Sequence, residues 1–197
     1  MVYLVILWIC ISCIELGLMY WINKKESELT LSIKKYGSLL FVGNGMLCLL
    51  SLYKENRSGF STYWYFGLFS YLLYLTMYDL RFKELPDWLH IGELLFYIGL
   101  WIVGKQEISI QESVLITIIL AVIFGVLFLL KQEALGVGDM KVLLICSMYV
   151  GSFCFGIILR GMIVAFFVSL LLLLSKKATA KTELPFVPFL LLGALMM

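Results

Sequence analysis

The sequence predicts an all-α integral membrane protein with about eight transmembrane helices. Of its 197 residues, 62% are hydrophobic and 14% are charged, whereas soluble domains are about 45–50% apolar and about 25% charged. Apolar runs recur along the whole chain with only short polar stretches between them. One integral domain over residues 1–197 is therefore expected. The net charge of +2 does not imply a nucleic-acid partner.

The first two helices are predicted at residues 2–22 and 36–53. Both are close to the roughly 20 apolar residues that cross a bilayer core of about 30 Å. No basic residue precedes the first run, and a lysine-rich loop at 23–35 follows it, where a cleaved signal peptide has small residues. We therefore expect the first helix to remain as a membrane anchor.

The third helix is predicted at residues 60–78, with aromatic side chains at both ends. Aromatic rings favour the membrane interface. Both ends are therefore expected at a boundary of the bilayer, which places Asp79 near water. Further helices are predicted at 87–103 and 113–130, with polar stretches between them.

The apolar stretch 142–174 is too long for one crossing. The pairs Gly151-Ser152 and Arg160-Gly161 interrupt it, which predicts two short helices joined by a tight turn, with Arg160 at that turn. A last, short helix is predicted at 184–197.

The basic residues predict the orientation of the chain. With both termini outside, the loops after the odd-numbered helices hold all 15 lysine and arginine residues except Lys54, Arg57, Lys105 and Arg160. The positive-inside rule assigns the basic side to the cytoplasm. Asp79 and Asp139 then share the cytoplasmic face, although their motifs were not used in this argument.

The short polar stretch Gly136-Val137-Gly138-Asp139-Met140-Lys141 separates two apolar runs. Its glycines permit φ > 0 and allow another chain to approach Asp139 closely, which suits a site that handles a peptide. Asp79 also follows an apolar run. We therefore expect the two aspartates to form a pair.

Two carboxyl groups held a few ångströms apart share a proton and titrate as one unit. One can act as a base on water while the other, protonated, polarises a carbonyl group. This is the chemistry of aspartic proteolysis, which needs no metal and no covalent nucleophile. The alternative is that each aspartate only caps or flanks a helix end. The shared face and the glycines favour the functional interpretation.

Three blocks resemble the type IV prepilin peptidase family of GxGD membrane aspartic proteases, which are similar to preflagellin peptidases and, more distantly, to presenilin. The blocks are Asp79-Leu80-Arg81-Phe82-Lys83-Glu84-Leu85-Pro86-Asp87, Gly136-Val137-Gly138-Asp139-Met140-Lys141 and Leu184-Pro185-Phe186-Val187-Pro188-Phe189. Together, in this order, they are more specific than a lone GxGD motif. The similarity covers about residues 60–197, which would form the peptidase core.

The resemblance implies removal of a short basic leader from a prepilin-like precursor, a type IV pilin or pseudopilin. The cut would fall after a glycine, at the cytoplasmic face of the cell membrane, with no cofactor. It implies catalysis by Asp79 and Asp139. It also implies that the following residues shape the site or bind substrate: Gly136, Gly138, Lys141, Pro86, Asp87, Pro185 and Pro188. Acidic residues near the site could attract the leader or merely balance neighbouring lysines: Glu84, Asp87, Glu133 and Glu183.

Many bacterial members carry, after the first helix, an insert with two Cys-x-x-Cys pairs that is associated with methylation of the new pilin N-terminus. The loop at 23–35 has no cysteine, and Cys10 and Cys13 lie within an apolar run. A structural zinc site needs four ligands. We therefore expect all five cysteines to be small buried apolar residues, and we expect peptidase activity without the methyltransferase.

The alternative function is a small transporter or a non-enzymatic membrane subunit, in which Asp79 and Asp139 relay protons or bind a cation. Aspartates within reach of one water would favour the peptidase, and aspartates separated by a helix diameter would favour the alternative. Of the other polar residues, His90 is expected to be solvated or at a helix start. Glu93 lies inside a predicted span and could line the site.

Overall fold

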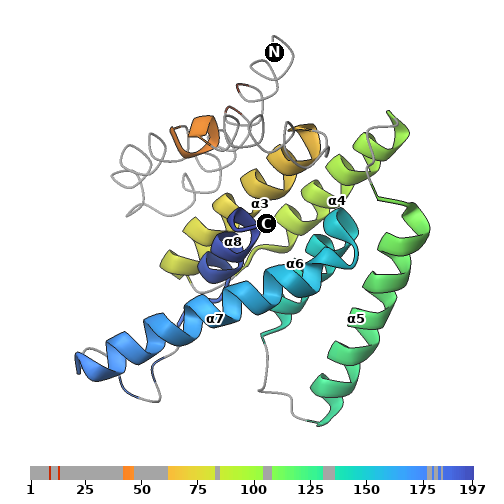
Figure 1. The fold of residues 1–197 in the computed structure, drawn as a ribbon. Coiled ribbons are helices and arrows are strands. Elements are labelled where there is room, and N and C mark those ends of the chain that lie inside the picture. The colour runs from red at the N-terminus through yellow and green to blue at the C-terminus, as the bar shows by residue number, and fades with distance from the viewer. Residues whose placement is uncertain are drawn as a thin grey trace. The chain divides into compact units, whose positions relative to one another are not determined.

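The computed structural model describes residues 9, 13, 42–46, 62–82, 85–103, 108–130, 136–176, 179, 182 and 184–197 (Figure 1). The chain divides into two compact units, Met1–Phe66 and Gly67–Met197, and most described residues belong to the second. All regular secondary structure in the described part is helical, which confirms the all-α prediction.

The helices with described bounds are α3 (Thr62–Phe82), α4 (Asp87–Ile102), α5 (Ile110–Leu130), α6 (Val137–Val150), α7 (Phe153–Leu174) and α8 (Val187–Leu195). Helix α3 continues past the predicted end at Tyr78, so Asp79 lies in its last turn. Helix α4 begins directly after Pro86, whose extended backbone (φ −74°, ψ 130°) ends the preceding segment.

Helices α5 and α7 are long and apolar enough to cross a membrane. Few of their residues are buried inside the protein. Their apolar side chains therefore face outward, which is typical of lipid-facing helices and not of the core helices of a soluble protein. Helices α4, α6 and α8 have 16, 14 and 9 residues, fewer than the roughly 20 that a full crossing needs. The described residues therefore do not show the eight predicted transmembrane helices. Most of the two helices predicted at 2–22 and 36–53 lies outside the described residues.

The break predicted in the stretch 142–174 is at Gly151-Ser152, between α6 and α7. Gly151 has φ 51°, a left-handed conformation that glycine adopts without steric cost. The prediction of a turn at Arg160 is wrong, because Arg160 and Gly161 lie inside α7. Gly161 instead contacts the backbone of α8, so the residue serves close helix packing.

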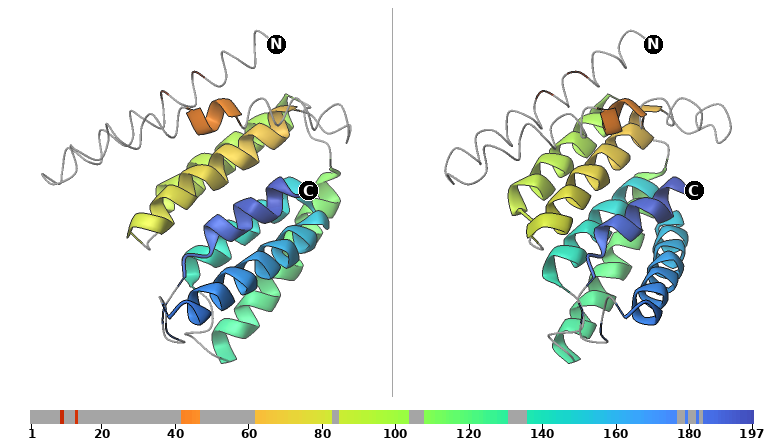
Figure 2. Two further views of the ribbon diagram at one scale, coloured as in Figure 1. Left: turned by 60° about the vertical axis from the view of Figure 1, so that its left-hand side comes forward. Right: turned by 90° about the vertical axis from the view of Figure 1, so that its left-hand side faces the viewer.

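Helix α6 is the central element of the second unit. It packs against α4, α5 and α7, while α8 packs along α7 (Figures 1 and 2). Its side chains Val142, Cys146 and Tyr149 are fully buried. Three neighbouring helices therefore position α6, whose first turn carries Asp139.

Two of the five cysteines confirm the prediction of buried apolar roles, since Cys146 and Cys154 are both free thiols in the interior. The prediction is wrong for Cys13, which is exposed. An apolar helix offers a small apolar side chain an outward position as readily as an inward one. Cys10 and Cys48 lie outside the described residues.

Candidate active site

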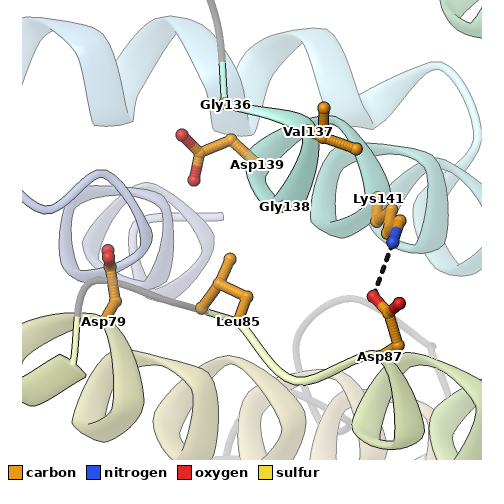
Figure 3. Close-up of a pocket in the computed structure, with 8 residues that line it drawn as sticks. All are labelled: Asp79, Leu85, Asp87, Gly136, Val137, Gly138, Asp139 and Lys141. Carbon is orange, nitrogen blue, oxygen red and sulfur yellow. Dashed lines mark hydrogen bonds and ion pairs between the residues drawn. The ribbon is translucent and has the colours of Figure 1, made fainter.

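Asp79 and Asp139, which come from distant parts of the sequence, line one open pocket (Figure 3). Its volume is about 430 Å³, within the range of about 300–1,000 Å³ that is usual for ligand sites. The lining residues are Asp79, Leu85, Asp87, Gly136, Val137, Gly138, Asp139 and Lys141. The end of α3, the start of α4 and the first turn of α6 therefore meet at this pocket.

Asp79 projects into the pocket from the last turn of α3, and its side chain is buried, with 7% of the residue exposed. The expectation that Asp79 lies near water therefore holds only through the pocket that it lines. Its Oδ2 atom accepts a hydrogen bond of 3.0 Å from the backbone N–H of Val187, the first residue of α8. A buried carboxylate needs such a donor, because an unpaired buried charge is costly.

Asp139 is in the first turn of α6, before the apolar run that begins at Val142. In Figure 3 its carboxyl group faces the same cavity as that of Asp79. Burial, and after it the negative charge of Asp79, raises the pKa of Asp139 to about 6. The two carboxyl groups are thus electrostatically coupled, and Asp139 holds a proton more firmly than an ordinary aspartic acid.

Both glycines of the GxGD motif line the pocket. The predicted need for φ > 0 is wrong, whereas the close approach of another chain to Asp139 stays a prediction. Gly136 caps α6 with φ −62°, and Gly138 lies within the helix, so neither position requires φ > 0. Space is the constraint instead. A Cβ atom on Gly136 would lie 3.2 Å from Asp139 Oδ2, and one on Gly138 would lie 3.1 Å from Leu85 Cδ1. Any side chain there would crowd the pocket.

Lys141 and Asp87 form an ion pair at the pocket, with Nζ and Oδ1 2.5 Å apart (Figure 3). The pair joins the first residue of α4 to the fifth residue of α6. Both side chains are exposed, 41% for Lys141 and 72% for Asp87, so water and salt screen their attraction. The ion pair therefore helps to orient α4 relative to α6 more than it stabilises the fold.

The three predicted prolines are not among the pocket-lining residues. Pro86 caps α4, while Pro185 and Pro188 flank Val187 at the start of α8. Any effect of these prolines on the pocket therefore acts through the backbone conformation that they fix. Sequence reasoning missed Leu85 and Val137 as lining residues, although both are apolar neighbours of motif residues. It also missed the Val187 N–H, because a backbone donor leaves no residue type in the sequence to recognise.

His90 and Glu93 belong to the interior between helices, not to the pocket. His90 lies in the first turn of α4, which confirms the predicted helix-start position. It is buried, and its Nδ1 atom shares a hydrogen bond of 2.7 Å with the hydroxyl of Tyr71, so the alternative of a solvated histidine is wrong. It lies on the side of α4 that faces α3. Glu93 accepts a hydrogen bond from the Tyr149 hydroxyl of α6. Both side chains thus satisfy buried polar partners.

Among the described residues, no group of three or more histidine, cysteine, aspartate or glutamate side chains could hold a metal ion. That the reaction at this pocket needs no metal ion stays a prediction. Glu84, Glu133 and Glu183, to which an attraction for a basic leader was assigned, lie outside the described residues.

Residues 66–176 match the type IV leader peptidase family. The match covers more than half of the 197 residues and contains every residue that lines the pocket. Comparison with curated proteins and with solved structures gives no match. The third motif block lies beyond the matched residues, while the first two lie within them. Two outward-facing helices long and apolar enough to cross a membrane indicate a membrane protein, and the chain belongs to the type IV leader peptidase family, a family of proteases.

Proposed function

We propose that this chain is an aspartic endopeptidase that removes the short leader peptide from prepilin-like precursors, with Asp79 and Asp139 as its catalytic pair. The observation that carries the proposal is their convergence on one pocket from α3 and α6. An aspartate that only flanked a helix end would have no reason to share a cavity with a second one. The electrostatic coupling between the two carboxyl groups supports the same conclusion.

The difference between the two carboxyl groups favours different roles for them. Asp139, with its pKa raised to about 6, is the better proton donor. Asp79 is assigned as the base: its deeper burial disfavours the charged form, and the backbone N–H bond that it accepts acts in the opposite direction, favouring the charged carboxylate. A pair of groups whose environments separate their proton affinities is the usual arrangement for acid/base catalysis.

The reaction then proceeds by water attack on the scissile peptide. Asp79 takes a proton from water as the water oxygen bonds to the carbonyl carbon, and Asp139 gives its proton to the carbonyl oxygen. The resulting gem-diol collapses when Asp79 passes its proton to the amide nitrogen, the C–N bond breaks, and Asp139 recovers a proton from a diol hydroxyl. The products are a carboxylic acid and an amine, and both aspartates return to their starting states.

The distribution of basic residues supports a multi-pass protein whose pocket opens at the cytoplasmic face of the cell membrane. A precursor with an apolar helix could lie in the bilayer while its leader reaches the pocket from water. Two glycines line the pocket beside Asp139 and add no side chain to its wall. These features fit a substrate cut next to a membrane helix.

Co-expression of the full chain with tagged type IV prepilins and pseudopilins, followed by N-terminal sequencing of the products, tests this function. Asp79→Asn and Asp139→Asn are each expected to lower cleavage at least about a hundredfold, because general acid or base catalysis contributes about 10²–10⁴-fold. Protein abundance in the membrane is expected to stay normal, since asparagine has nearly the same volume.

Glu112→Gln is the matched control. Glu112 lies in α5, outside the pocket, and accepts a 2.7 Å hydrogen bond from Ser152 Oγ that an amide oxygen can also accept. This variant is expected to cleave normally. A wild-type chain that cuts none of the precursors, or an Asp79→Asn or Asp139→Asn variant with near-normal activity, would contradict the proposal and favour proton or cation coupling.

A further inference from the structure

The N-terminus of α8 is directed at Asp79. Helix α8 begins at Val187, whose backbone N–H donates to Asp79 Oδ2 at 3.0 Å. Val187 is fully buried, and Asp79 is nearly so. The N–H groups of a first helical turn have no acceptor within the helix and carry its positive end. A carboxylate at this position is therefore stabilised by both the hydrogen bond and the helix dipole.

In the first turn of α8, the residues after Val187 offer no N–H to another helix, so the N–H of Val187 is the available hydrogen-bond donor. Pro188 has no N–H. The N–H of Phe189 is 3.1 Å from the Phe186 carbonyl oxygen, and that of Leu190 is 3.2 Å from the same oxygen. Because a buried backbone N–H needs an acceptor, the Val187 N–H requires a group from another helix. Asp79 supplies it from α3.

Two glycines hold α8 against α7 at the distance that this contact requires. A Cβ atom on Gly193 would lie 2.4 Å from the carbonyl oxygen of Ile157 and 2.8 Å from the N atom of Gly161. A Cβ atom on Gly161 would lie 2.8 Å from the carbonyl oxygen of Phe189. All three neighbours are backbone atoms, so the clash is relieved only if a helix moves. The helices therefore cross at a pair of glycines, as small residues allow in membrane proteins.

We propose that the Val187 N–H, held in place by the Gly161–Gly193 crossing, keeps Asp79 as the ionised member of the pair and so makes it the base that activates water. This inference rests on the proposed function, because it assigns a cause to one step of that reaction. Val187, Gly161 and Gly193 act as positioning residues, since none of them is among the residues that line the pocket. The competing explanation is that Asp79 merely caps α8.

The two explanations differ in their effect on pH dependence. If the N–H favours the ionised form, its loss moves the acid limb of the pH–rate profile upward by about one to two pH units, which corresponds to a hydrogen bond to a charged group. If Asp79 only caps the helix, activity falls equally at all pH values. The titratable groups that share the pocket with Asp79 are Asp139, Asp87 and Lys141. The described helix α8 carries no titratable side chain that could add to the effect.

The sharpest perturbation is to replace Val187 by its α-hydroxy acid through nonsense suppression in the full chain. The ester keeps the side chain and removes the N–H, and it also weakens the Phe186 carbonyl oxygen as the acceptor for Phe189 and Leu190. The same replacement at Leu192, in the interior of α8 and not bonded to Asp79, is the matched control for a weaker helix. Cleavage of a tagged prepilin, measured over a range of pH, is expected to show a shifted acid limb for the Val187 ester alone.

A second pair of variants tests the crossing. Gly193→Ala is expected to shift the acid limb in the same direction as the Val187 ester. Gly156→Ala, on α7, is expected to match the wild type, because a Cβ atom there would meet only the Arg160 side chain at 3.9 Å. If Gly193→Ala does not accumulate in the membrane, the Val187 ester still decides the question.

An infrared titration separates this inference from the proposed function. The titration is done in the Asp139→Asn variant. The infrared band of protonated Asp79 is identified there because it disappears when Asp79→Asn is added. The Val187 ester is expected to raise the pH at which that band disappears, even if the chain cuts no prepilin. An unchanged midpoint, or an equal loss of cleavage at all pH values, would overturn the role of the Val187 N–H. A wild-type chain that cuts no prepilin would overturn only the peptidase assignment.

Discussion

Gly138→Ala is the most informative change at the GxGD motif, because the pocket shows what the new methyl group would meet. A Cβ atom at Gly138 would lie 3.1, 3.2 and 3.4 Å from Cδ1, Cβ and Cγ of Leu85. The first two distances are shorter than ordinary van der Waals contact, and the third is at its limit. Either Leu85 or the first turn of α6 must shift by a few tenths of an ångström. A shift of α6 displaces Asp139 relative to Asp79.

Overpacking of this kind costs about 1–3 kcal/mol, and about 1.4 kcal/mol corresponds to a tenfold change in rate. One methyl group belongs at the lower end, so Gly138→Ala is expected to lower kcat/KM about fivefold. Gly138→Val adds two further methyl groups and is expected to lower it roughly a hundredfold. Purified protein in nanodiscs with a tagged prepilin substrate gives these rates. Gly125→Ala on α5 is the control, because nothing lies within 4 Å of a Cβ atom there.

Leu85→Ala provides the test of mechanism. It removes the Cδ1 and Cγ contacts and leaves only the Cβ contact at 3.2 Å. Gly138→Ala should therefore cost less in a Leu85→Ala background than in the wild type, which gives a non-zero coupling energy in a double-mutant cycle. The same fivefold loss in both backgrounds would refute the steric argument and would indicate that the glycine acts through the backbone.

Three further predictions concern the same pocket. Because the acid form of Asp139 is needed and its pKa is about 6, cleavage is expected to fall about tenfold per pH unit above that value; a rate that stays flat through neutral pH would contradict this role. Lys141→Met, which removes the exposed ion pair with Asp87, is expected to slow cleavage less than Gly138→Ala, with wild type and variant converging at high salt. Chelators are expected to leave cleavage intact, and strong inhibition of purified protein by a chelator would indicate a different chemistry.

Much of the fold follows from local sequence because membrane helices are apolar runs bounded by polar, proline or glycine residues. The run before Asp79 predicts α3, Pro86 predicts the start of α4, and Gly151 predicts the break between α6 and α7. Arg160 was misjudged because an exposed arginine within a helix and an arginine in a turn give the same local signal. The face of α4 that packs inward is not visible in an all-apolar run, so the burial of His90 beside Tyr71 could not be predicted.

The pairing of the two aspartates was predictable, and the detail of their surroundings was not. The count of basic residues and the order of the motifs predict that Asp79 and Asp139 lie on one face, and both line one pocket. The prediction for Gly138 combined backbone freedom with the close approach of another chain, and the structure shows a steric constraint from Leu85 in place of the backbone freedom. The sequence shows the same residue whether a glycine is needed for its backbone freedom or for its small size. Only the positions of neighbouring helices distinguish a glycine that needs an unusual φ from one that needs an empty volume.

The start of α8 shows what a local sequence pattern can predict about a contact with a distant segment. Prolines on both sides of Val187 mark a helix N-terminus, and Pro188 removes one N–H from its first turn. With the N–H of Phe189 directed to the Phe186 carbonyl, the turn keeps the Val187 N–H for an external acceptor. Such a motif therefore predicts an acceptor in another segment, without saying which one. The acceptor is a carboxylate 108 residues earlier in the chain, so the third motif block bears on the pocket through a backbone group and not through either proline.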